Sequence, residues 1–248
     1  MRNVLLITGA SSGVGLSLAQ YLSGKYEVIA VARRRERMQE ALGDRSQVML
    51  RQADLSQPDE VEQLIHWLKS EFGHIPYVIN NAGVNIRNAI DVLSPDQMNR
   101  CMMVNALAPL AILRGLLPEM KAKNFGRVIN VTSGAPLNCF PEYAAYSASK
   151  GALNAVTVTC AKECAALNIR INLMSPGPVR TEMAPHATMD PSACHPTVNY
   201  LLGLDEQGPT GRFFWLGYEI PLFPDLEGID WMGGKADERF KRVLEVAQ

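Results

Sequence analysis

The sequence predicts an α/β fold: one doubly wound parallel sheet with helices on both faces. Short apolar runs rich in β-branched residues alternate with longer segments of helical spacing, and a glycine-rich turn follows the first run. Each apolar run is too short for a helix, so it is predicted as a buried strand. Repeated strand–helix units give right-handed crossovers and a parallel sheet. In such sheets ligands bind beyond the carboxyl ends of the strands, which is where we look for chemistry.

The elements follow in order along the chain. The predicted strands are Val4–Ile7, Val28–Val31, Val48–Leu50, Tyr77–Ile79, Val128–Val131 and Ile169–Leu173. The predicted helices are Leu16–Leu22, Val61–Phe72, Met98–Met120, Ala145–Leu167 and Pro191–Leu202. A last strand is expected within "GRFFWLG". We expect one domain over residues 1–216 and a tail over residues 217–248 that packs on the same domain or on a neighbouring subunit.

Length and charge exclude several classes of function. A chain of 248 residues with 47% hydrophobic residues can bury a sizeable core. Its net charge of −1, with both signs interspersed, creates no positive electrostatic field that would attract nucleic acid. The first apolar run is too short for a signal peptide, and no segment reads as a membrane span. Five cysteines without CxxC spacing suit reduced thiols, and the four histidines suggest no metal site. We expect a cytoplasmic protein with no metal and neither nucleic acid nor membrane as partner.

The turn after the first strand reads "TGASSGVG", residues 8–15. Glycines at positions 9, 13 and 15 let the backbone turn sharply and approach a pyrophosphate, which would lie at the N-terminus of the next helix. A purely structural glycine turn is the alternative. Its position after the first strand favours dinucleotide binding.

The second strand ends without a carboxylate to take the ribose 2′-hydroxyl of NAD. Ala32, Arg33 and Arg34 stand there instead. Guanidinium groups bind phosphate in a bidentate fork, so this end predicts a pocket for the 2′-phosphate of NADP. A solvated basic start to a helix is the alternative.

The third and fourth strands also end in polar residues. Asp54 would accept a hydrogen bond from an adenine amino group, or would cap the turn before Pro58. The motif "NNAG" at residues 80–83 forms either an asparagine-rich turn or a wall beside the nicotinamide ribose.

Tyr146 and Lys150 are four residues apart, so they share one face of a helix. Tyr143 has Ser147 at that spacing, and we expect it to line the pocket or support the loop. Ser133 follows the fifth strand, thirteen residues before Tyr146. Asn105 falls inside an apolar helix, where a buried amide either bridges backbone groups or positions a water.

Taken together, "TGASSGVG", "NNAG", "VNALAP", "INVTSG", "YSASKGAL" and "SPGPVRTEM" closely resemble the signature motifs of the short-chain dehydrogenase/reductase family. The resemblance runs from Val4 to about Thr181 and implies a Rossmann-type domain. It implies a catalytic tetrad of Asn105, Ser133, Tyr146 and Lys150. The predicted cofactor-binding residues are Gly9, Ser11, Ser12, Gly13, Val14, Gly15, Arg33, Arg34, Asp54, Leu55, Asn81, Ala82, Gly83, Tyr146, Lys150, Pro176, Gly177, Val179 and Thr181.

This set of residues suits the reduction of a carbonyl. Hydride transfer leaves charge on oxygen, so a proton donor and a hydrogen bond are needed there. Tyr146 would be the donor, its pKa lowered from about 10 by the nearby ammonium of Lys150. Ser133 would orient the carbonyl, and Asn105 would hold a water that helps to reprotonate Tyr146. We predict an NADP(H)-dependent oxidoreductase, with NAD(H) as the alternative cofactor.

The type of reaction, the substrate and the oligomeric state remain open to alternatives. The same tyrosine could serve a non-redox isomerase or lyase, or the fold could bind a dinucleotide as a silent regulator. The substrate would be a small carbonyl or alcohol, held by residues 134–143 and 182–194. We expect a homodimer or homotetramer. From Glu182 onward the resemblance thins, and we expect residues 217–234 to pack near the pocket mouth, anchored by a final amphipathic helix.

Overall fold

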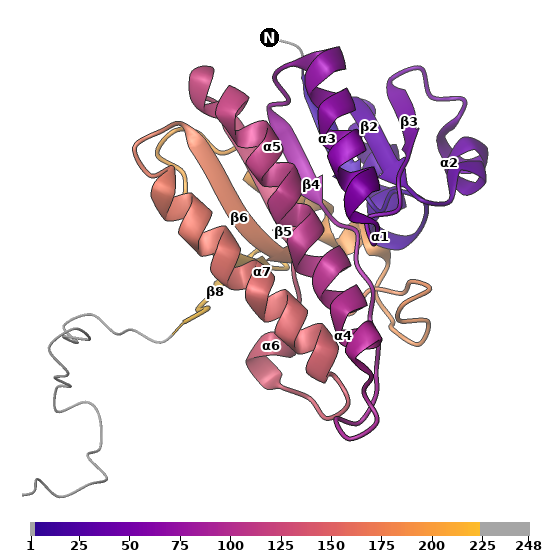
Figure 1. Ribbon diagram of the computed structural model, residues 1–248. Coiled ribbons are helices and arrows are strands. Elements are labelled where there is room, and N and C mark those ends of the chain that lie inside the picture. Colours follow the sequence, from indigo (N-terminus) through magenta and orange to yellow (C-terminus); the bar gives the residue numbers. More distant parts are fainter. Residues whose placement is uncertain (1–2, 224–248) are drawn as a thin grey trace, which may run out of the picture.

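An eight-stranded sheet forms the centre of the molecule (Figure 1). The computed structural model describes residues 3–223. The strands are β1 (Val4–Thr8), β2 (Glu27–Ala32), β3 (Val48–Gln52), β4 (Tyr77–Asn80), β5 (Gly126–Val131), β6 (Ile169–Ser175), β7 (Phe213–Trp215) and β8 (Tyr218–Ile220). They lie in the order β3-β2-β1-β4-β5-β6-β7-β8. The first seven strands are parallel, and β8 pairs with β7 antiparallel.

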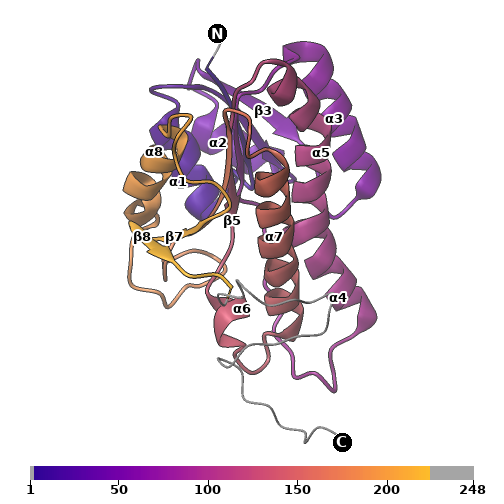
Figure 2. The ribbon, with the colours of Figure 1, turned by 90° about the vertical axis from the view of Figure 1, so that its left-hand side faces the viewer.

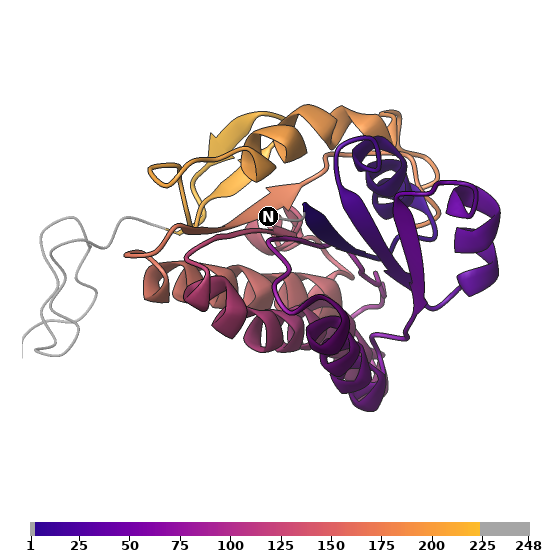
Figure 3. The same cartoon turned by 90° about the horizontal axis from the view of Figure 1, so that it is seen from above.

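Helices cover both faces of this sheet, as Figures 2 and 3 show. They are α1 (Gly13–Leu22), α2 (Arg35–Leu42), α3 (Pro58–Phe72), α4 (Pro95–Met102), α5 (Ala108–Ala122), α6 (Ala135–Asn138), α7 (Ala144–Glu163) and α8 (His195–Leu202). One apolar core joins the sheet to α3, α5 and α7, and a second joins it to α1, α2 and α8. Because β1 and β4 are neighbours, the strand order reverses between them, which is where this class of sheet binds ligands.

Local sequence explains where the helices begin. Pro58 stands in the first turn of α3, where its missing N–H costs nothing, and Asp59 and Glu60 follow at the positive end of the helix dipole. Ser94 and Gln97 form a capping box at the start of α4.

The α/β prediction is confirmed, and the six predicted strands form as β1 to β6, with the expected last strand as β7. Three elements were not predicted: α2, whose sequence is mostly charged, the short helix α6 and the short strand β8. The expected helix from Met98 to Met120 is longer and interrupted, because a π-helical turn at Met103–Leu107 joins α4 to α5.

The run Pro95–Ala122 also corrects the expectation that no segment reads as a membrane span. Among residues 3–223 it alone is long and apolar enough to cross a membrane by those two criteria. Half of its most apolar stretch is buried inside the fold, as in a core helix. The proposed pocket cover begins within the described residues at β8, whereas the rest of the tail, residues 224–248, and its final helix lie outside them.

Candidate active site

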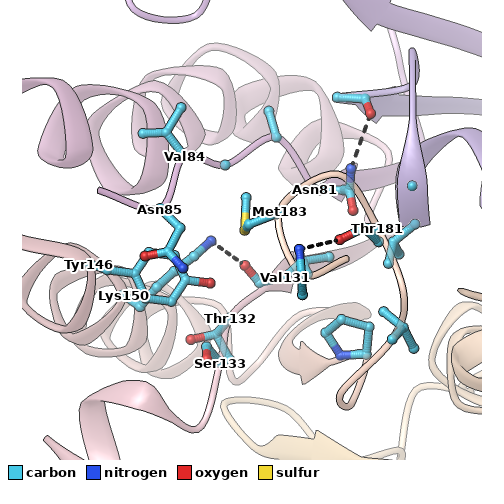
Figure 4. A pocket seen from close by; sticks show the side chains of 18 of the residues that line it. Asn81, Val84, Asn85, Val131, Thr132, Ser133, Tyr146, Lys150, Thr181 and Met183 are labelled. Carbon is cyan, nitrogen blue, oxygen red and sulfur yellow. Dashed lines mark hydrogen bonds between the residues drawn. The ribbon is translucent and has the colours of Figure 1, made fainter. Parts of the chain in front are cut away.

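A cavity of about 990 Å³ opens at the carboxyl ends of the strands (Figure 4). All the predicted cofactor-binding residues line it except Gly15. Ser133 lines it too, but Asn105 does not. Residues from both segments expected to hold the substrate complete the wall, among them Leu137, Phe140, Tyr143 and Met183. The structure therefore brings most of the predicted site into one cavity.

The glycine-rich turn is held tightly against the end of β4. Gly9 has φ +72°, and a Cβ there would lie 2.8 Å from the Cα of Ala82. The side-chain amide of Asn81 donates to the Thr8 carbonyl at 2.9 Å and to the Gly9 carbonyl at 3.4 Å. Gly15 lies behind this turn, where a Cβ would come within 2.3 Å of the Gly9 carbonyl oxygen. Gly15 thus supports the turn by close packing instead of lining the cavity.

The N-terminus of α1 faces the cavity without a side-chain cap. Ser12 precedes the helix in an extended conformation, its side chain caps no backbone N–H, and the first turn carries no acidic residue. The uncapped N–H groups and the helix dipole favour an anion at this point.

Two arginines at the end of β2 line the same part of the cavity, in different environments. The Arg34 guanidinium donates to Ser12 Oγ at 2.7 Å and to Ser11 Oγ at 3.3 Å. It also forms an ion pair at 2.8 Å with Glu182, which Arg37 contacts as well. Arg33 is exposed, and within residues 3–223 its guanidinium makes no ion pair.

Asp54 caps its own turn while lining the cavity. Its Oδ1 accepts from the Ser56 amide at 2.9 Å and from the Ser56 hydroxyl at 2.8 Å. The capping alternative is therefore present in the structure, and contact with an adenine stays a prediction.

Tyr146, Ser133 and Lys150 come together at the inner part of the cavity. Ser133 lies close enough to the Tyr146 hydroxyl for its side chain to lower the pKa of the phenol. Lys150 Nζ is buried and donates to the Val131 carbonyl at 2.7 Å. Burial lowers the pKa of Lys150 from its ordinary 10.5 to about 8, so the amine is mostly charged at neutral pH.

The pKa of Tyr146 moves against expectation. Burial raises it above the ordinary 10, and the nearby Ser133 side chain opposes this rise without cancelling it. Lys150 Nζ lies 6.0 Å from the centre of the Tyr146 ring, and its ammonium is not among the causes of the shift. The expected lowering of the pKa by Lys150 is thus not seen in the protein alone.

Asn105 lies in the π-helical turn, and its amide is fully engaged. Its Oδ1 accepts from the Val84 amide at 2.8 Å, and its Nδ2 donates to the Val84 carbonyl and to Ser149 Oγ, both at 2.9 Å. The bridging alternative is therefore present, although the bridged backbone is the segment after β4. The water-holding role of Asn105 stays a prediction.

Sequence reasoning assigned no place in the cavity wall to Asn85, Arg87 and Trp215, whereas Ile220 belongs to the segment expected near the pocket mouth. Asn85 lies two residues beyond "NNAG". Its short distance from the end of a strand was the one signal in the sequence that could have placed it in the cavity. Trp215 and Ile220 arrive through the β7–β8 hairpin, whose short strands carry little periodicity.

A reversing parallel sheet with a glycine-rich turn at its reversal point defines a doubly wound protein of the dinucleotide-binding class. Residues 3–191 match the family model of the short chain dehydrogenases, and the chain belongs to this family. An uncharacterized oxidoreductase of Staphylococcus saprophyticus is 31% identical over 231 residues, which are 85% of this chain and 94% of that protein.

Two solved structures extend this relationship. A 4-hydroxyisoleucine dehydrogenase complexed with NADH matches with a TM-score of 0.81 at 27% identity, covering 86% of this chain and 96% of that one. A metagenomic short-chain oxidoreductase in complex with NADP matches with a TM-score of 0.76, also at 27% identity, over 86% and 96% of the two chains.

Proposed function

We propose that the protein is an NADP-dependent oxidoreductase that interconverts a ketone or aldehyde with an alcohol, with Tyr146 as general acid and base. One observation carries this proposal. The neighbouring hydroxyls of Tyr146 and Ser133, with the buried amine of Lys150, line the same cavity as the glycine-rich turn.

The residues present fit a nicotinamide dinucleotide. The cavity is large enough, at about 990 Å³, and it joins an uncapped helix N-terminus to a proton donor. When bound, the dinucleotide supplies or accepts the hydride. Ser11, Ser12 and the turn at Gly9 and Gly13 would hold its phosphates, and Asn81 and Lys150 would lie beside its ribose.

The side chains then divide the remaining work. Tyr146 donates a proton to the carbonyl oxygen during reduction, and Ser133 donates a hydrogen bond to that oxygen. The charged Lys150 favours loss of the tyrosyl proton, and its attraction counts for more once the cavity is closed to water. Asn105 acts by holding Val84 and Ser149 in place beside these groups.

The preference for NADP is proposed from the arginines at the end of β2. Arg33 is exposed at the cavity and has no carboxylate partner among residues 3–223, and the Arg34 guanidinium donates to the serines of the glycine-rich turn. No acidic residue occupies positions 32–34, where it would repel a 2′-phosphate. The proposed environment is the cytoplasm, and the proposed assembly is a homodimer or homotetramer.

A screen of ketones, aldehydes and alcohols with NADPH and NADH tests the proposal by the absorbance of the reduced cofactor. We expect substrate-dependent, stoichiometric change of NADPH absorbance. Conversion of substrate without any change in cofactor would indicate an isomerase or lyase. Tight cofactor binding with no conversion of any compound would indicate a regulator.

A further inference from the structure

Asn85 places an amide without partners in the wall of the cavity. Its Oδ1 is buried and accepts no hydrogen bond from residues 3–223. In Figure 4 the side chain extends from the segment after β4 toward the part of the cavity that holds Tyr146 and Lys150. Leaving a buried polar group unpaired costs about 1–3 kcal/mol of folding free energy. Such a group in a cavity wall therefore needs an explanation, and ligand binding provides one.

The backbone that carries Asn85 is fixed from behind. The amide of Asn105 binds both the N–H and the C=O of Val84, the preceding residue. Gly83 admits this arrangement, because a Cβ there would lie 3.3 Å from Asn105 Oδ1 and 3.6 Å from Lys150 Nζ. Asn105 comes from a π-helical turn, a feature frequent at functional sites. These contacts hold the Asn85 amide in a fixed position, with its hydrogen-bonding capacity unused.

The cavity as a whole also carries exposed apolar side chains. The large apolar side chains that line it while staying at least 40% exposed are Leu137, Phe140, Met183 and Trp215. Exposed apolar side chains gathered in a cavity favour a ligand with an apolar body. Asn85 adds a polar contact beside them, separate from the two hydroxyls proposed to bind the reacting oxygen.

We propose that Asn85 binds the substrate through a second oxygen-bearing group near the reacting carbonyl. This inference rests on the carbonyl reduction proposed above and gives its substrate class. That class is a carbonyl compound with a second carbonyl or hydroxyl oxygen close to the first and an apolar remainder. The amide offers both a donor and an acceptor, so it serves the oxygen in its carbonyl or its hydroxyl form.

Two probes isolate the second oxygen: 1-phenylbutane-1,3-dione and 4-phenylbutan-2-one, which lacks only that oxygen. Binding of each is measured by calorimetry with NADP⁺ present, and reduction is measured separately with NADPH. The variants are Asn85→Leu and, as the matched control, Asn88→Leu. Asn88 lies three residues further along the same segment but does not line the cavity, and its amide already donates to Gln97 Oε1 at 3.0 Å.

The wild type should bind the dione at least tenfold more tightly than the monoketone, Asn85→Leu should bind both alike, and Asn88→Leu should keep the wild-type ratio. Because the leucine removes an unpaired buried amide, Asn85→Leu should also melt no lower than the wild type. Equal binding of the probes by the wild type, no binding of either, or an unchanged ratio in Asn85→Leu would overturn the inference. If the wild type binds the dione more tightly but reduces neither probe, the proposed function is wrong and the role of Asn85 stands. If the wild type reduces both probes without distinguishing them, the role of Asn85 is wrong and the proposed function stands.

Discussion

The amine of Lys150 lies 6.0 Å from the centre of the Tyr146 ring, one turn further along α7. The amine is buried, and the main-chain carbonyl of Val131 holds it in place. Tyr143, three residues before Tyr146, has Ser147 instead of a lysine one turn further along α7. The guanidinium of Arg87, from another segment, lies 4.7 Å from the centre of the Tyr143 ring. Tyr143 lines the cavity and contacts Tyr146 edge to face, with the ring centres 6.2 Å apart. The spacing of four residues therefore distinguishes the two tyrosines, and two predictions below depend on it.

Stability should depend on pH through Lys150. Burial lowers the pKa of its amine from 10.5 to about 8, so between these values the unfolded chain binds a proton that the folded chain does not. The free energy of unfolding contributed by this group therefore rises with pH from about 8 to 10.5. Denaturant unfolding measured across this pH range should give a free energy of unfolding with a contribution that rises with pH in the wild type. This contribution should be missing from Lys150→Met. Identical pH slopes in the two proteins would show that the amine titrates normally in the fold.

Cofactor choice should depend on the end of β2. NADPH should be preferred over NADH at least tenfold in kcat/KM, about 1.4 kcal/mol, through Arg33 with help from Arg34. Replacing Ala32 by Asp and Arg33 by Gln should reverse the preference, because the new carboxylate repels a 2′-phosphate and accepts from a 2′-hydroxyl. Equal use of both cofactors by the wild type would refute the assignment.

Glu182 should weaken the binding of NADPH. Hydrogen bonds from Arg34 and Arg37 hold the pKa of this carboxyl below its usual value, so it stays ionised and competes with a phosphate for Arg34. Exposed ion pairs contribute little, so Glu182→Gln should tighten NADPH binding only a few-fold and leave NADH binding unchanged. Fluorescence titration measures both constants.

Glu142→Gln is the matched control, because Glu142 pairs with a different arginine, Arg87, at 3.6 Å. A Glu182→Gln variant that bound NADPH no better than Glu142→Gln would show that the carboxylate does not compete with the cofactor.

The tail should affect the substrate more than the cofactor. Trp215 and Ile220 of the β7–β8 hairpin line the cavity, and the chain continues from β8. Ending the protein after Phe223 keeps this hairpin, which a cut after Leu216 would destroy. If the tail covers the pocket mouth, the shortened protein should show a several-fold change in substrate KM or kcat at unchanged NADPH affinity. Unchanged kinetics in a folded protein of the same oligomeric state would make the tail structural.

The sequence predicted the fold well because its signals were local. Buried parallel strands such as Val28–Val31 are continuous apolar runs, and the glycine at position 9 marks a turn that admits no Cβ. Strand β7 was expected within "GRFFWLG", but β8 carried no comparable signal, since a three-residue strand shows no period. Helix α2 was missed because charge dominates its sequence, with Met38 and Leu42 its only buried residues.

The site was predictable where residue type and strand end coincide, as at Ser133 and Arg34. It was not predictable where function depends on long-range contacts. The pairing of Glu182 with Arg34 joins residues 148 positions apart, and the backbone next to Asn85 is held by Asn105 of the π-helical turn, 20 residues further along the chain. The pKa of Tyr146 could not be judged from spacing either, because its direction depends on how deeply the phenol is buried.

The central claim is that the hydroxyl of Tyr146 moves the proton in carbonyl reduction. Its most direct test is the single-turnover rate of NADPH oxidation by a ketone substrate in Tyr146→Phe, compared with Tyr143→Phe and the wild type, with NADPH affinity measured alongside. We predict a loss of several powers of ten in Tyr146→Phe at nearly unchanged NADPH affinity, and a rate within about tenfold of the wild type in Tyr143→Phe. Retention of the wild-type rate in Tyr146→Phe would contradict the account.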